Sequence, residues 1–145
     1  MTEAAQPKSQ AVLSSILIAV AGAVIVAAII LPPYWSSRRE SRRAERFAAR
    51  AQPVLDALIE AERGYKERQG KFWRDQNEIL SAEAVKQALG VDLGAATDCR
   101  FAIYPPDLVA DPTLRLAARG TGEAEGIVIE CAYDAIAHTK TCKGS

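Results

Sequence analysis

The feature that most constrains the fold is an uncharged apolar segment near the N-terminus. From Ala11 to Leu31 the chain has no Asp, Glu, Lys or Arg, and Ile, Val, Ala and Leu dominate. As a helix rising 1.5 Å per residue, this segment reaches roughly 30 Å, the thickness of a bilayer's hydrocarbon core. We therefore predict a transmembrane helix over residues 11–33, preceded by a polar tail at residues 1–10.

A secretory signal peptide is the competing interpretation, because the apolar segment follows Lys8 close to the N-terminus. Signal peptides have a shorter apolar region and small residues at the cleavage site. Here the bulky sequence Pro32-Pro33-Tyr34-Trp35 follows instead. These residues favour an uncleaved, single-pass span.

Aromatic and basic residues collect directly after the span. Tyr34 and Trp35 stand where aromatic rings anchor a helix at the lipid headgroups. Arginines follow in the same stretch, including Arg38, Arg39, Arg42 and Arg43. Because the formal net charge of the 145 residues is zero, we interpret the arginines as a collar at the membrane interface. The expected partners are the lipid bilayer and other membrane subunits, with no nucleic acid.

An amphipathic stalk helix is expected over residues 34–70. Pro32 predicts a kink or short break, after which Ser36 or Ser37 could cap a new helix. Pro53 should bend the stalk without ending it, and Gly70 should end it. Apolar residues recur along one face: Phe47, Ala51, Val54, Leu55, Leu58, Ile59, Ala61 and Tyr65. The opposite face is expected to carry Glu62, paired with Lys66 one turn later.

Residues 71–145 are expected to form a small α+β head. A short helix is predicted over residues 81–89, capped by Ser81 and ended by Gly90. Strand-like runs follow at 99–104, 114–118 and 126–133, and residues 137–142 could add a fourth strand. A sheet this small needs an apolar cover. The stalk can supply one through Phe47, Val54, Leu58 and Tyr65.

Nothing in the sequence indicates catalysis or a cofactor. The chain has no Cys-x-x-Cys, no Gly-rich phosphate loop and no Ser-His-Asp order. His138 is expected to be a solvent-facing strand residue rather than a general base. The turn residues Asp107, Asp111 and Asp134 are expected to cap their own backbone. We expect a non-enzymatic protein without a cofactor.

Phe72 and Trp73, which follow Gly70-Lys71, have two interpretations. They could be an aromatic anchor for a partner protein. The commoner role of such a pair is to fold a loop back onto its own domain, and we favour that role.

The run from Ile18 to Tyr34, followed by a charged helix and a cysteine-containing sheet, resembles a type IV pilin or pseudopilin. Leu31, Pro32 and Tyr34 match the Leu-Pro-x-Tyr break that ends the family's hydrophobic helix. The resemblance implies a long helix packed on a small antiparallel sheet. It also implies a structural or assembly subunit.

Two departures from the pilin pattern concern processing. Aligned on the break, the prepilin peptidase bond falls between Gln10 and Ala11, and the family requires Gly where this chain has Gln10. The carboxylate that pilins bury early in the helix falls on Ser15. Without the cut there is no new amine for a carboxylate to neutralise. We therefore expect the leader to be kept, with Ser14 and Ser15 as small residues packing against a partner helix.

Three cysteines, Cys99, Cys131 and Cys142, cannot all pair within one chain. We favour Cys131 with Cys142, because a hairpin of this length brings them near and pilin-like heads often close their C-terminal region this way. Cys99 with Cys142 is the main alternative. A zinc site would need all three and His138, and their spacing matches no compact ligand pair.

The topology has two opposed indications. The positive-inside rule would place the arginine collar, and so the head, in the cytoplasm. The pilin resemblance and the cysteines favour a head in the periplasm on a bacterial inner-membrane anchor, with the N-terminus cytoplasmic. We favour the periplasmic head.

Three functions stay open. The first is an unprocessed pilin-like subunit that docks on a larger membrane complex or on pilus or secretion machinery. The second is a processed minor pilin or pseudopilin of a type IV pilus or type II secretion system. The third is a single-pass sensor with an extracytoplasmic ligand-binding head, which is less favoured because only ten residues precede the span. The partner's identity and homo-oligomerisation are left open.

Overall fold

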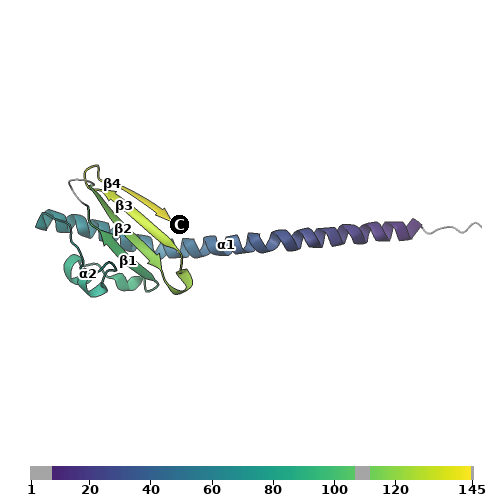
Figure 1. Cartoon of the computed structure of the whole chain (residues 1–145), viewed down its shortest axis with the longest axis horizontal. Helices are drawn as coiled ribbons and strands as arrows, with labels where there is room; N and C mark the ends of the chain where they lie inside the picture. Colours follow the sequence, from purple (N-terminus) through teal and green to yellow (C-terminus); the bar gives the residue numbers. More distant parts are fainter. Residues whose placement is uncertain (1–7, 107–111, 145) are drawn as a thin grey trace, which may run out of the picture. The chain divides into compact units, whose positions relative to one another are not determined.

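The computed structural model describes residues 8–106 and 112–144 (Figure 1). Asp107, Asp111 and most of the predicted N-terminal tail lie outside these residues. The chain divides into two compact units, Met1–Ser41 and Arg42–Ser145. Helix α1 (Lys8–Gln69) contributes residues to both units, and all other helices and strands belong to the second unit.

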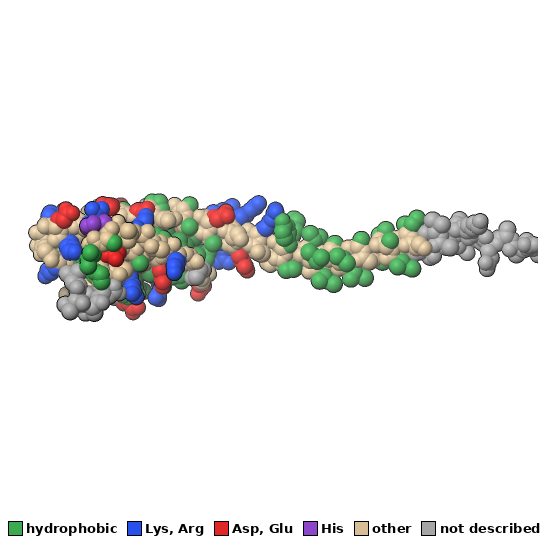
Figure 2. All heavy atoms as spheres, turned by 90° about the horizontal axis from the view of Figure 1, so that it is seen from above, with side chains coloured by type: hydrophobic (Ala, Val, Ile, Leu, Met, Phe, Trp, Pro, Cys, Tyr) green, Lys and Arg blue, Asp and Glu red, His purple; other side chains and the backbone are tan. Residues whose placement is uncertain are grey.

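The first unit contains the apolar part of α1. Among the described residues, α1 is the helix long and apolar enough to cross a membrane, with a window of mean hydropathy 2.7. Its large apolar side chains are exposed, including Leu17, Val24 and Ile29 (Figure 2). The length and composition of this segment support membrane anchoring.

The prediction that a new helix begins after Pro32 is wrong. Helix α1 continues through Pro32, Pro33 and Pro53 without interruption. The Ser36 hydroxyl donates to the Pro33 carbonyl oxygen at 2.9 Å, inside the helix, rather than capping an N-terminus. A proline removes one donor from the helical ladder, and the turns on either side keep the chain helical.

The end of α1 is as predicted. Gly70 takes a left-handed φ of 74°, and its N–H donates to the Lys66 carbonyl oxygen at 2.7 Å. Helix α2 (Ala82–Leu89) also has the predicted boundaries, with Ser81 at its N-cap and Gly90 at its C-cap. Short 3-10 turns lie at η1 (Leu93–Ala95) and η2 (Gly122–Ala124).

Four antiparallel strands form one sheet in the order in which they occur in the chain, β1 (Cys99–Tyr104), β2 (Thr113–Gly120), β3 (Val128–Asp134) and β4 (Thr139–Gly144) (Figure 1). The α+β prediction and the antiparallel meander are confirmed, and of the three or four strands predicted the sheet has four. The third strand begins two residues later than predicted, because Gly126 occupies a turn with a φ of 88°. The fourth begins at Thr139 because residues 135–138 form the β3–β4 turn.

The core of the second unit lies between α1 and one face of the sheet. Phe47, Leu55 and Leu58 of α1 are fully buried, which confirms that the apolar stripe covers the sheet. Tyr65, the last predicted member of the stripe, is half-buried. From the sheet and α2 the core receives Phe101, Ile103, Leu114, Leu116, Ala118, Ile129, Cys131, Tyr133 and Val85.

Candidate functional site

The predicted interface residues of the first unit are all exposed. These are Tyr34, Trp35, Arg38 and Arg39. The Arg38 guanidinium lies 4.6 Å from the centre of the Tyr34 ring, within the range of a cation–π contact. Such a pair presents an aromatic ring and a positive charge together, as headgroup-level anchors do.

The other two predicted interface residues belong to the second unit. Arg42 and Arg43 are both exposed, and Arg43 donates from Nη2 to the backbone carbonyl of Glu123 in η2. Arg43 therefore ties α1 to the head. The sequence could not indicate this contact, because the two residues are far apart in the chain.

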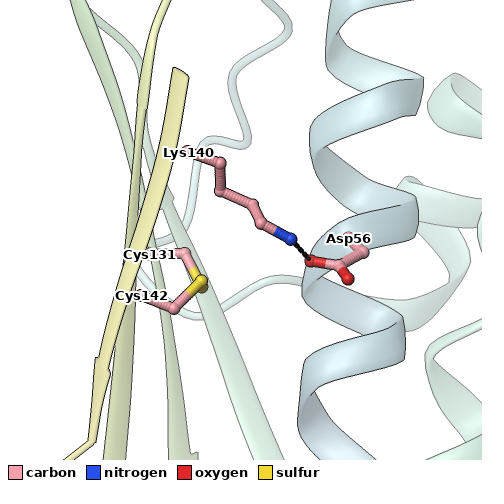
Figure 3. The surroundings of a disulfide bond; sticks show 4 residues. All are labelled: Asp56, Cys131, Lys140 and Cys142. Atoms are coloured by element: carbon pink, nitrogen blue, oxygen red, sulfur yellow. Dashed lines mark hydrogen bonds and ion pairs between the residues drawn. A yellow bond between two sulfur atoms is a disulfide. The ribbon is translucent and has the colours of Figure 1, made fainter.

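A disulfide joins Cys131 of β3 to Cys142 of β4 (Figure 3). The two residues are directly opposite in the strand register, with their Cα atoms 4.1 Å apart. This is the pairing that the sequence favoured. Because Cys131 and Cys142 are bonded to each other, only Cys99 and His138 remain of the four ligands that the alternative zinc site required.

Cys99 is the free cysteine among the described residues, and it is half-buried. Burial raises the pKa of its thiol to about 11, and the neighbouring Asp98 adds to the effect. Because the thiolate is the reactive form, this cysteine is poorly suited to nucleophilic or metal-binding chemistry.

Within the described residues, two ion pairs connect α1 to the head. Lys140 Nζ of β4 lies 2.6 Å from Asp56 Oδ1, on the side of the sheet that carries the disulfide (Figure 3). Arg50 Nη2 lies 2.6 Å from Asp98 Oδ2. Partly exposed pairs such as these contribute about 0 to 1 kcal/mol each, so they position the helix more than they stabilise it.

Glu62 is the largest departure from the sequence interpretation. Its exposed fraction is 0%, although it was predicted on the polar face of α1. Its Oε2 accepts a hydrogen bond from the Trp73 N–H at 2.9 Å, and its buried Oε1 has no hydrogen-bond partner among the described residues. The predicted pair with Lys66 does not form, because the Lys66 ammonium instead lies 4.8 Å from the centre of the Phe72 ring. Burial raises the pKa of Glu62 to about 7, and the Trp73 hydrogen bond lowers it in part.

Phe72 and Trp73 fold back onto the head. The exposed fraction of Phe72 is 9%, and Trp73 packs half-buried against the core. Phe72 therefore offers little surface to a partner. Of the other two predicted partner contacts, Ser15 is exposed on α1, and Ser14 lies on α1 with its side chain outside the described set.

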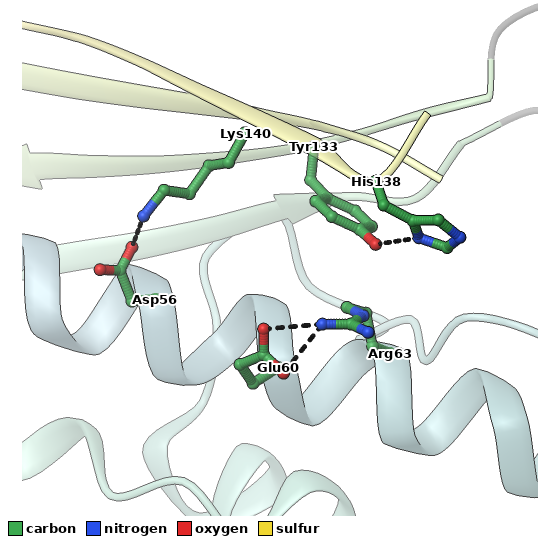
Figure 4. Close-up of polar contacts among 6 residues, drawn as sticks. All are labelled: Asp56, Glu60, Arg63, Tyr133, His138 and Lys140. Atoms are coloured by element: carbon green, nitrogen blue, oxygen red, sulfur yellow. Dashed lines mark hydrogen bonds and ion pairs between the residues drawn. The ribbon is translucent and has the colours of Figure 1, made fainter. Parts of the chain in front are cut away.

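His138 lies in the β3–β4 turn with a φ of 55°, so the prediction that it lies on a strand is wrong. Its Nδ1 is 2.8 Å from the Tyr133 hydroxyl (Figure 4). The Arg63 guanidinium of α1 lies 5.9 Å from the centre of the Tyr133 ring and pairs with Glu60 at 2.9 Å. The cluster holds the turn against α1, and Asp134 caps the turn through the N–H groups of residues 136 and 137.

Comparisons with protein-family models, with curated proteins and with solved structures find no match to this chain. The likeness to pilins is therefore one of architecture: a long apolar N-terminal helix followed by a small antiparallel sheet.

Proposed function

We propose that this chain is a non-enzymatic structural or assembly subunit, anchored in the membrane, that docks on a larger membrane complex or on pilus or secretion machinery. One observation carries the proposal. A single helix, α1, contains both an exposed apolar stretch of mean hydropathy 2.7 and the stripe that builds the core of the head. Exposed apolar surface of this extent needs lipid or partner helices around it.

We place the head in the periplasm of a bacterial cell, with the N-terminus in the cytoplasm. The Cys131–Cys142 disulfide supports this orientation, because disulfides persist in oxidising compartments. The arginines after the span argue in the opposite direction, but a charged helix just after the span is common in pilin-type proteins.

We also propose that the bond between Gln10 and Ala11 stays intact. Cleavage would create an amine at Ala11, and Ser15 supplies a hydroxyl rather than the carboxylate that could neutralise it. An unneutralised charge in hydrocarbon is costly.

The docking proposal can be tested with a C-terminally tagged chain expressed in its own host and extracted in mild detergent. Native gel electrophoresis should place the chain in an assembly much larger than a monomer. A matched variant replaces residues 15–31 by alternating Leu and Ala, which keeps the anchor but changes the helix surface. This variant should remain in the membrane and leave the assembly.

Two results would contradict the proposal. One is a wild-type chain that migrates as a detergent-bound monomer in its own host. The other is wild-type protein that alkaline carbonate releases from the membrane fraction.

A further inference from the structure

The face of the sheet that points away from α1 carries a groove of about 720 Å³. Its lining includes Tyr104, Ala117, Arg119, Glu130 and Lys143. A smaller groove of about 430 Å³ adjoins it and shares Tyr104 and Arg119. We call this side of the sheet the outer face. It consists of the residues of β1 to β4 whose positions alternate along each strand with those of the core residues.

The floor of the outer face is made of small side chains. Ala102 and Ala117 are directly opposite in the β1–β2 register. Their exposed fractions are 6% and 3%, yet neither belongs to the core cluster between the sheet and α1. Tyr104 and Arg119 line both grooves beside them, so the floor lies between longer side chains.

Two arginines face each other at one end of this floor. Arg100 and Arg119 are directly opposite in the register, and both are exposed. Like charges placed directly opposite on a sheet destabilise it. Neither side chain makes a hydrogen bond or ion pair within the described part of the chain. A carboxylate between them would replace repulsion with charge-assisted hydrogen bonds.

The signs of the surrounding charges restrict what can bind. Arg115 and Lys143 add positive charge to the larger groove, and carboxylates stand among these cations. Glu130 lies beside Lys143 in the β3–β4 register, and Glu78 and Glu125 line the adjoining groove. A uniformly negative surface, such as an anionic bilayer or a nucleic acid, would meet these carboxylates as well as the arginines. A protein segment can place carboxylates at the arginines and other side chains at the glutamates.

We propose that the outer face binds an extended, carboxylate-bearing segment of a partner protein, with its acidic side chain between Arg100 and Arg119 and its backbone over the Ala102–Ala117 floor. This inference deepens the proposed function by naming the chemistry of the docking partner. It is tested on the purified full chain, so that it can fail separately from the proposal that an assembly forms in the cell.

The probe is a fluorescein-labelled peptide of alternating Glu and Ala, mixed at low salt with the full-length protein in uncharged detergent micelles. Fluorescence anisotropy should show binding that weakens about tenfold or more in the double variant R100Q/R119Q. The control R74Q/K86Q removes the same charge from exposed residues outside the sheet, and should change the affinity by less than about twofold. The variant Ala117→Leu fills the floor without changing any charge and should weaken binding about fivefold or more, with an unchanged circular dichroism spectrum.

Three results would overturn the inference. One is equal binding of a Gln–Ala peptide, and another is an equal loss of affinity in R74Q/K86Q, which would indicate net charge alone. In the third, the Glu–Ala peptide does not bind, but vesicles of phosphatidylcholine and phosphatidylglycerol bind through the same two arginines. That result would make the outer face a lipid-binding site. If the peptide result holds while the tagged chain is monomeric in its host, the docking inference survives and the proposed assembly fails.

Discussion

The carboxylate of Glu62 accepts a hydrogen bond from the backbone N–H of Trp73, 2.9 Å away, at a position that solvent does not reach. This bond joins α1 to the segment that follows Gly70 and returns toward α2. It satisfies one oxygen of the carboxylate, and the other is buried with no partner in the described part of the chain. The second unit thus contains a carboxyl group whose charged form is destabilised by burial.

The stability of the head should fall as the pH rises through the pKa of Glu62. That pKa is raised from 4.5 to about 7 by burial, so the folded state binds the proton more tightly than the unfolded state. The resulting stabilisation is up to about 3 kcal/mol. It is fully present below about pH 4.5 and is lost once the pH exceeds about 7. Urea unfolding of the purified chain in micelles from pH 5 to 8, followed by tryptophan fluorescence, measures the change.

The matched control for this pH dependence is Glu62→Gln. The amide oxygen can still accept the Trp73 N–H, but the side chain does not ionise. This variant should be more stable than wild type at pH 8 by about 1 to 3 kcal/mol, and its stability should vary less with pH. The same pH slope in both proteins would show that another group controls it.

Removing the Cys131–Cys142 disulfide should destabilise the head by about 2 to 4 kcal/mol, because the bond closes a loop between residues separated by 11 positions. The double substitution to Ala should lower the urea midpoint, and Cys99→Ala is the control that retains the disulfide. Mass spectrometry after alkylation of the urea-unfolded protein without reductant should find Cys99 as the modified cysteine, because unfolding removes the burial that raises the pKa of its thiol. Alkylation of all three cysteines would contradict the pairing.

Alkaline phosphatase fused after Ser145 should be active in a Gram-negative host, because that enzyme needs disulfides and therefore an oxidising compartment. A reporter that works only in the cytoplasm, fused at the same site, should be silent. The reverse pattern would place the head in the cytoplasm, as the arginine collar alone predicts.

Mass spectrometry of protein purified from a host with a prepilin peptidase should recover peptides that cross the Gln10–Ala11 bond. The double variant Gln10→Gly with Ser15→Glu restores both features of the pilin pattern and should be cut at that bond, which shows that the peptidase is active. A wild-type N-terminus at Ala11 would restore the processed minor-pilin hypothesis.

Much of this fold could be predicted because its signals are local. Gly70 and Gly90 end their helices through backbone conformations that glycine adopts easily. Strand-like runs bounded by turn residues located β1, β2 and β3, and left β4 as a possible fourth strand. The Cys131–Cys142 pairing was favoured over Cys99–Cys142 by the length of one hairpin and by the resemblance to pilin heads. These features depend on residues that are close in the sequence.

The failures have different physical causes. Glu62 was assigned to the polar face by its charge, although it follows Leu58 by four residues and Ile59 by three, and so continues the buried stripe. Helical spacing was the signal that could have located it. The position of Arg100 opposite Arg119 depends on the register of β1 against β2. The lengths of the strands do not determine that register by themselves.

The disulfide also determines how the head responds to mechanical force. Strand β4 is mostly exposed and lies at the edge of the sheet, so hydrogen bonds to β3 and the contacts of Lys140 and Cys142 hold it. A force that pulls on the C-terminus would unzip such a strand one residue at a time. With Cys142 bonded to Cys131, unzipping stops after the last residues, and the tension passes through a covalent bond into β3, the neighbouring interior strand. The C-terminal edge is thereby the mechanically locked side of the head.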